Sequence, residues 1–66
     1  MEKPIQLKAA RVNANLTQKE AAEILGISRG TLANYESYTT KPDISTSKKL
    51  AKLYGLTVDE IIFFKS

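Results

Sequence analysis

The sequence predicts an all-α fold, a compact bundle of five helices formed by one domain that spans residues 1–66. A chain of 66 residues can enclose one small hydrophobic core. Its segments are rich in Ala, Leu, Lys and Glu, which favour helices, and they lack the alternation of apolar and polar residues that is typical of strands. Glycine, asparagine, serine and proline separate these segments at 13–15, 26–28, 37–42 and 55–57.

The first helix is expected over residues 5–14. Residues that recur at steps of three and four place one face toward the core, and they are Leu7, Ala10, Arg11 and Ala14. Asn15 is one of the few non-glycine residues that tolerates a left-handed backbone, so we expect the helix to end there.

The second helix begins at Thr17, which forms a predicted capping box with Glu20, and it ends at Gly26. Ser28 is a good cap for a third helix that continues to about Ser37. The residues expected on the inner faces of these two helices are Ala21, Ala22, Ile24, Leu25, Leu32 and Tyr35.

The fourth helix is expected to begin after Asp43, its cap, and to end at Gly55. Thr57 and Glu60 form a second capping-box pattern, which predicts a short fifth helix through Phe64.

The composition excludes several classes of function. The chain has no cysteine and no histidine, so thiolate catalysis, imidazole acid–base catalysis and most zinc sites are not expected. We therefore expect no enzyme activity, no metal, no cofactor and no small-molecule effector. No apolar run is long enough to span a membrane, and we expect no secretory signal at the N-terminus. A net charge of +3 is compatible with a polyanionic partner.

One group of residues is more specific than the composition. Its members are Leu16-Thr17-Gln18, Ala21-Ala22, Leu25-Gly26-Ile27-Ser28, Leu32, Tyr35-Glu36, Lys41-Pro42, Leu50-Ala51 and Gly55-Leu56-Thr57. In this pattern the chain resembles the Cro/repressor-type (XRE-like) helix-turn-helix regulators of phages and bacteria. The resemblance implies a lambda-repressor-like domain whose helix-turn-helix unit covers residues 17–37, and a third helix that enters the DNA major groove.

Projection of the third helix identifies its outward surface. With Leu32 and Tyr35 facing inward, the outward residues are small or carry hydrogen-bonding groups. The predicted base contacts are Ser28, Arg29, Gly30, Ala33 and Asn34. Arg29 suits guanine, and Asn34 suits adenine. The alternatives are a solvated surface cation at Arg29 and a polar filler at Asn34.

Phosphate contacts are expected around this helix. Gln18 matches the position that clamps a phosphate in the family, and the full predicted set is Gln18, Lys19, Thr31, Ser37, Thr39, Thr40 and Lys41. The alternative for Lys19 is an ion pair with Glu23. The resemblance also implies a structural ion pair between Arg11 and Glu36. The family often has glycine where this chain has Tyr38, which leaves the path of the following loop open.

The expected function is that of a sequence-specific regulator of transcription, a dimeric repressor on a palindromic double-stranded DNA operator. The dimer interface is expected to use Phe63 and Phe64. The alternative is that Phe64 folds back onto the protein and that Phe63 is a single exposed apolar side chain without a partner surface. The expected location is the nucleoid in the cytoplasm of a bacterial or phage-infected cell. The alternative function is an antitoxin-like or other protein-interaction subunit.

Overall fold

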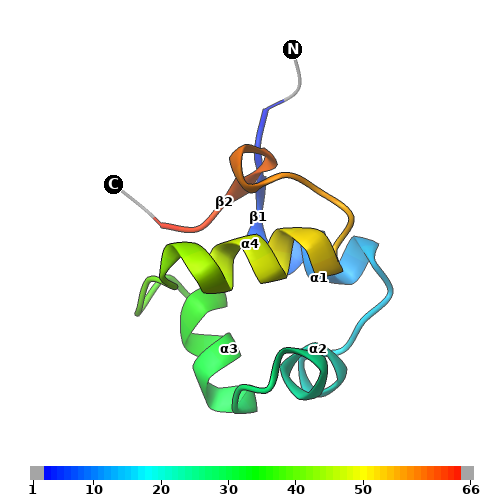
Figure 1. Cartoon of the computed structure of the whole chain (residues 1–66), viewed down its shortest axis with the longest axis vertical. Coiled ribbons are helices and arrows are strands. Elements are labelled where there is room, and N and C mark those ends of the chain that lie inside the picture. The colour runs from blue at the N-terminus through cyan, green and yellow to red at the C-terminus, as the bar shows by residue number, and fades with distance from the viewer. Residues whose placement is uncertain (1–2, 65–66) are drawn as a thin grey trace.

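The computed structural model describes residues 3–64. The described chain consists of packed helices with a short parallel strand pair at one end, on the side of α1 and α4 away from α2 and α3 (Figure 1). Its elements in order are β1 (Ile5–Gln6), α1 (Leu7–Asn13), α2 (Gln18–Leu25), α3 (Arg29–Glu36), α4 (Ile44–Leu53), a 3₁₀ helix η1 (Val58–Glu60) and β2 (Ile61–Ile62). The fold is therefore predominantly helical, as the sequence predicts, with four α-helices in the described residues.

The core lies where α1, α3 and α4 meet. Each of these helices contributes one large side chain that is fully buried, and these are Leu7, Leu32 and Leu50. Helix α2 contributes Ala21 and Ala22, which are 0% and 2% exposed. Alanine is small enough to let the backbone of α2 lie close to its neighbours, so α2 and α3 pack tightly at the turn that joins them.

The predicted starts of the second, third and fourth helices are confirmed. The Thr17 hydroxyl accepts a hydrogen bond from the Glu20 amide at 3.1 Å, and the Glu20 carboxylate accepts one from the Thr17 amide at 2.9 Å. Ser28 accepts from the amide of Thr31, which caps α3. Asp43 accepts from the Thr46 amide at 2.7 Å, and this bond lowers the pKa of the Asp43 carboxyl. Each cap satisfies an amide that has no partner within its own helix.

All four α-helices end in the same way. A left-handed residue follows each helix, and the next amide donates to a carbonyl five residues back, which is the Schellman arrangement. The left-handed residues are Asn15, Gly26, Tyr38 and Gly55, with φ between 61° and 73°. The corresponding amide-to-carbonyl bonds are Leu16 to Arg11, Ile27 to Ala22, Thr39 to Asn34, and Leu56 to Ala51.

Two predicted helical segments are wrong. Residues Ile5–Gln6 form β1 instead of the first turn of a helix, and the expected fifth helix is the 3₁₀ turn η1 followed by β2. The two strands pair in parallel, with Ile5 opposite Ile61. The Thr57 amide does donate to Glu60, as the capping pattern predicts, but the chain extends after one turn. Isoleucine is β-branched and favours an extended backbone, and Ile5 and Ile61 pair with each other across the two strands.

The change from helix to strand also changes which residues are exposed. In an extended segment alternate side chains face the same side, so Ile61 and Phe63 both point into the core and are 5% and 6% exposed. The expected exposure of Phe63 at a dimer interface is therefore wrong, whereas Phe64 is 56% exposed. Ile24, expected on the inner face of α2, is 62% exposed. Within residues 3–64, no helix is both long and apolar enough to cross a membrane.

Candidate nucleic-acid interface

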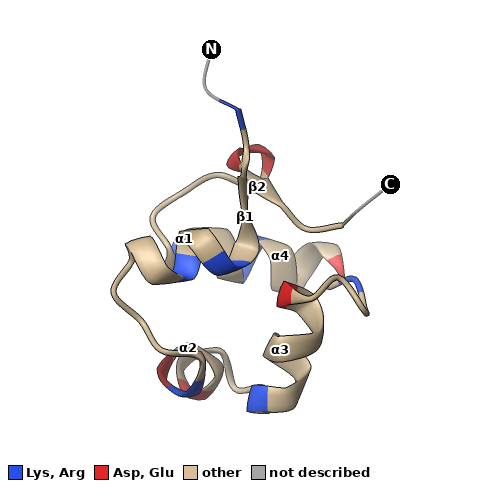
Figure 2. Ribbon diagram, turned by 180° about the vertical axis from the view of Figure 1, so that it is seen from behind, with Lys and Arg blue, Asp and Glu red and all other residues tan. Residues whose placement is uncertain are grey.

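The outward surface of α3 is largely open to solvent. Arg29, Gly30, Asn34 and Ser37 are exposed, and Ala33 is half-buried. No exposed carboxylate lies on this surface, because the side chain of Glu36 is 4% exposed and bonded to Arg11 of α1. Figure 2 shows basic positions on α1 and at the start of α3. Four of the five predicted base-contacting residues thus belong to α3, and the fifth, Ser28, is the exposed cap that precedes it.

Gly30 has no structural reason to be glycine within this chain. It lies in the first turn of α3, and it is not among the residues with a positive φ. A Cβ built at Gly30 would have one neighbour, the Ser28 hydroxyl, at 3.9 Å, which is an ordinary contact. Glycine costs helix stability relative to alanine, so its presence here is consistent with a surface that must approach another molecule closely.

Two pairs of predicted contact residues already bond to each other. The Ser28 and Thr31 hydroxyls are 2.7 Å apart, and Ser28 also caps α3. At the other end of the helix, the Ser37 and Thr39 hydroxyls are 2.8 Å apart. Each hydroxyl keeps hydrogen-bonding capacity beyond these contacts, because it has one donor and two acceptor sites.

An ion pair beneath the surface joins the first three α-helices. Nε of Arg11 in α1 donates to Glu36 in α3 at 2.7 Å, and Nη2 makes a second bond to the same carboxylate at 3.3 Å. Nη1 of Arg11 donates to the carbonyl of Leu16, just before α2, at 2.8 Å. The side chains of Arg11 and Glu36 are 9% and 4% exposed. The expected structural pair is therefore present in the structure.

Gln18 joins this network, which sequence reasoning missed. Its Nε2 donates to Glu36 Oε1 at 3.0 Å. The bond fixes the side chain of Gln18 at the start of α2, close to the amides that have no partner in the helix. Gln18 is thus held by α3 at the position where a phosphate contact is predicted.

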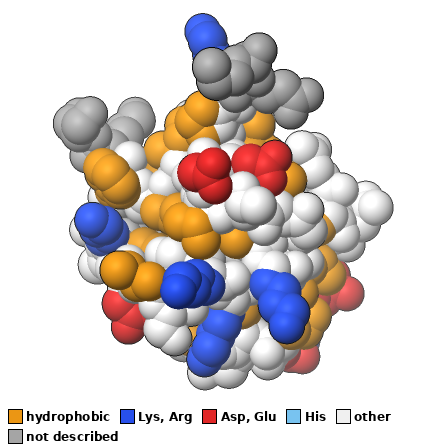
Figure 3. Space-filling view, turned by 45° about the horizontal axis from the view of Figure 1, so that its top comes forward, with side chains coloured by type: hydrophobic (Ala, Val, Ile, Leu, Met, Phe, Trp, Pro, Cys, Tyr) orange, Lys and Arg blue, Asp and Glu red, His pale blue; other side chains and the backbone are white. Residues whose placement is uncertain are grey.

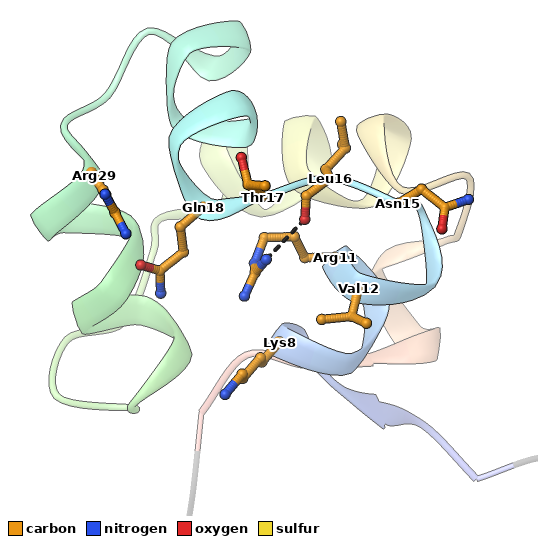
Figure 4. A pocket seen from close by; sticks show the side chains of 8 residues that line it. All are labelled: Lys8, Arg11, Val12, Asn15, Leu16, Thr17, Gln18 and Arg29. Atoms are coloured by element: carbon orange, nitrogen blue, oxygen red, sulfur yellow. Dashed lines mark hydrogen bonds between the residues drawn. The ribbon is translucent and has the colours of Figure 1, made fainter.

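A hollow of about 530 Å³ opens beside Gln18 (Figure 4). Side chains from three helices point into it, namely Lys8 of α1, Gln18 of α2 and Arg29 of α3. Lys8 and Gln18 also line a second hollow of about 280 Å³, together with Ala33, Glu36 and Ser37 of α3. The Glu36 carboxylate there accepts hydrogen bonds from Arg11 and Gln18. The two cations and the N-terminus of α2 make this region attractive to an anion.

Lys8 is the residue of this region that the sequence analysis missed. The signal was available, because Lys8 lies three residues before Arg11 and so shares its face of α1. Since Arg11 reaches α3, Lys8 must point toward the same side of the molecule.

The remaining predicted phosphate contacts lie around the ends of α2 and α3. Lys19 and Thr40 are exposed. The alternative pair of Lys19 with Glu23 is not formed, since Arg11–Glu36 is the one ion pair within 4.0 Å in the described residues. Lys41 lies over the ring of Phe64, with Nζ 4.4 Å from the ring centre. Residues 3–64 contain no cluster of three acidic, histidine or cysteine side chains that could hold a metal ion.

Comparison with known proteins agrees with this geometry. The helix-turn-helix family matches residues 7–61. The chain is 46% identical over 57 residues to the HTH-type transcriptional regulator ImmR of Bacillus subtilis (strain 168), covering 86% of this chain and 45% of that protein. It is 35% identical over 57 residues to the cryptic phage CTXphi transcriptional repressor RstR of Vibrio cholerae, covering 86% and 51%. It is also 33% identical over 60 residues to the HTH-type regulator MJ0272 of Methanocaldococcus jannaschii, covering 91% of each.

The fold and the exposed surface of α3 define a helix-turn-helix protein. The chain belongs to the helix-turn-helix family, and the relatives it matches include an HTH-type transcriptional regulator and a cryptic phage transcriptional repressor. It spans about half the length of ImmR and RstR. No solved structure gives a significant match.

Proposed function

We propose that this chain is a sequence-specific DNA-binding regulator of transcription, which reads the major groove with α3. The observation that carries the proposal is the outward surface of α3, which is open to solvent, carries no exposed carboxylate and combines a glycine with a guanidinium and an amide. Such a surface can approach base edges closely and present donors to them. The relatives named as transcriptional regulators support the same function.

Arg29 and Asn34 would read the bases. Arg29 is exposed in the first turn of α3, where the helix dipole disfavours a cation, and it has no carboxylate partner among the described residues. A forked contact to guanine would supply two acceptor atoms, O6 and N7, for this guanidinium. Asn34 presents an amide on the same surface and suits adenine. Each such pair corresponds to about 1–3 kcal/mol of discrimination against the wrong base.

The DNA backbone would be held on both sides of α3. On one side, the start of α2 offers free amides and the Gln18 side chain, and Lys8 borders the same hollow. On the other side, the loop after α3 offers the hydroxyls of Thr39 and Thr40. Contacts of this kind orient the protein on the duplex without reading its sequence.

We further propose that the regulator acts as a homodimer. Three exposed apolar side chains, Ile44, Val58 and Phe64, line one hollow of about 290 Å³ and are 74%, 39% and 56% exposed. Lys48 lines the same hollow, and Asp59 follows Val58. A two-fold pairing can set the basic part of one copy against the acidic part of the other. Figure 3 shows apolar side chains lying between basic side chains and a pair of acidic ones.

The dimer would act by occlusion on a palindromic operator. Two copies of α3 about one helical turn apart, roughly 34 Å, would occupy successive major grooves and exclude RNA polymerase. Sedimentation equilibrium tests the interface. Phe64→Asp should abolish association, whereas Ile24→Asp, a matched change at an exposed residue outside the hollow, should leave it intact. Equal behaviour of the two variants contradicts the proposed interface.

Selection of bound sites from random duplex DNA tests the function itself. The expected result is a short consensus with two related halves, bound with an affinity that falls steeply as salt is added because phosphate contacts release counterions. Recovery of no consensus, or binding that does not respond to salt, contradicts the proposal. The alternative of a protein-interaction subunit has a weaker basis, because one of the two phenylalanines on which it depends is buried.

A further inference from the structure

The end of α3 differs from the ends of the other α-helices. Asn15, Gly26 and Gly55 take the left-handed position elsewhere, and these residue types tolerate it. At α3 the same position is taken by Tyr38, with φ 62°. A bulky residue with a Cβ is unfavourable in this conformation, so some other interaction must hold Tyr38 there.

The Tyr38 side chain makes such an interaction. Its hydroxyl donates to the carbonyl of Ile62 at 3.1 Å, in the strand β2. The bond joins residues 24 positions apart, and it links the loop after α3 to the C-terminal strand. Lys41 over the Phe64 ring provides a second contact between the same two segments.

The loop that Tyr38 holds is built on the carbonyl of Asn34. That carbonyl accepts from the Thr39 amide at 2.9 Å, from the Thr40 amide at 3.3 Å and from the Ser37 hydroxyl at 3.2 Å. A shift of the loop would therefore disturb the backbone of Asn34, as well as move the Thr39 and Thr40 hydroxyls. The Tyr38 side chain is therefore bonded at the point where the end of α3 and the following loop share these hydrogen bonds.

We infer that Tyr38 is a positioning residue for DNA binding, and that its bond to Ile62 holds the loop of residues 37–40 where its hydroxyls reach phosphate. The inference rests on the proposed function, because it needs the duplex to lie against α3. Tyr38 itself is not a contact residue in this account. It acts through the loop, and its hydroxyl is directed to the protein.

Two substitutions separate positioning from stability. Tyr38→Phe removes the hydroxyl but keeps the unfavourable backbone, so its melting temperature should fall. Tyr38→Gly removes the hydroxyl and relieves the backbone, so it should melt higher than Tyr38→Phe. Both should bind a selected duplex and a random duplex more weakly than the parent, by about two- to tenfold, the factor that corresponds to one hydrogen bond. A purely structural role predicts instead that affinity follows melting temperature.

The measurements are fluorescence anisotropy with labelled duplexes and amide hydrogen exchange of the free protein. Exchange at Thr39 and Thr40 should be faster in both variants. Tyr54→Phe is the matched control, because it removes a tyrosine hydroxyl that has no hydrogen-bond partner among residues 3–64, and it should leave exchange and affinity unchanged.

Parent-like affinity of Tyr38→Gly, or unchanged exchange at Thr39 and Thr40, overturns the inference. Failure of the parent to bind any duplex would refute the proposed function, and hydrogen exchange would still decide whether Tyr38 holds the loop.

Discussion

The ion pair between Arg11 and Glu36 gives the most direct stability prediction. Glu36→Ala removes the acceptor of three hydrogen bonds, two from Arg11 and one from Gln18. It also leaves a guanidinium that is 9% exposed without its counter-charge. Breaking one side of a buried pair costs about 3–5 kcal/mol. A chain of this length has a free energy of unfolding of about 3–10 kcal/mol, so the variant should be marginally stable.

Urea unfolding followed by far-ultraviolet circular dichroism measures this cost. The double variant Arg11→Met with Glu36→Leu should recover most of the loss, because no charge then remains buried. Glu23→Ala, at an exposed carboxylate without an ion pair, is the control and should change the free energy of unfolding by about 0.5 kcal/mol or less. A cost below about 1 kcal/mol for Glu36→Ala would be typical of an exposed pair and would refute this reasoning.

Two further predictions concern single residues. Gly30→Ala should raise the free energy of unfolding by about 0.5–1 kcal/mol, since the new methyl group meets no obstacle inside the protein. It should also weaken DNA binding, because the methyl group lies on the proposed contact surface. A variant that is more stable and binds DNA like the parent contradicts that surface. Tyr54→Phe should be at least as stable as the parent at neutral pH, because the hydroxyl it removes is buried without a partner. Burial, and to a lesser extent the charge of Glu36, raises the pKa of Tyr54 from 10.0 to about 12. The stability linked to the neutral phenol is therefore complete below pH 10, and it is lost as the pH rises toward 12. The parent should therefore lose stability relative to Tyr54→Phe across that interval in thermal melts, and parallel pH profiles would contradict the shift.

The parts of the fold that the sequence predicts correctly depend on short-range interactions. Thr17, Ser28 and Asp43 cap helices by bonding to amides three residues ahead, so their patterns can be read locally. The helix ends at Asn15 and Gly26 can also be predicted locally, because these residue types tolerate the left-handed backbone that ends a helix. The identity of the outward residues of α3 follows from its helical period once its buried residues are known.

The parts that the sequence did not predict depend on distant partners. The segment at Ile61 has a helix-start pattern before it, and it becomes a strand because Ile5 lies beside it. The buried position of Phe63 follows from that change. The bonds of Gln18 to Glu36 and of Tyr38 to Ile62 likewise join residues far apart in the chain, which no local period reveals.

The ratio of affinities for a selected duplex and a random duplex tests the central claim, that α3 reads base edges. In Arg29→Ala this ratio should fall by about tenfold or more, because one forked base contact is lost. In Gln18→Ala both affinities should fall together and the ratio should hold, because a phosphate contact carries no sequence information. An unchanged ratio in Arg29→Ala would show that this surface does not recognise sequence.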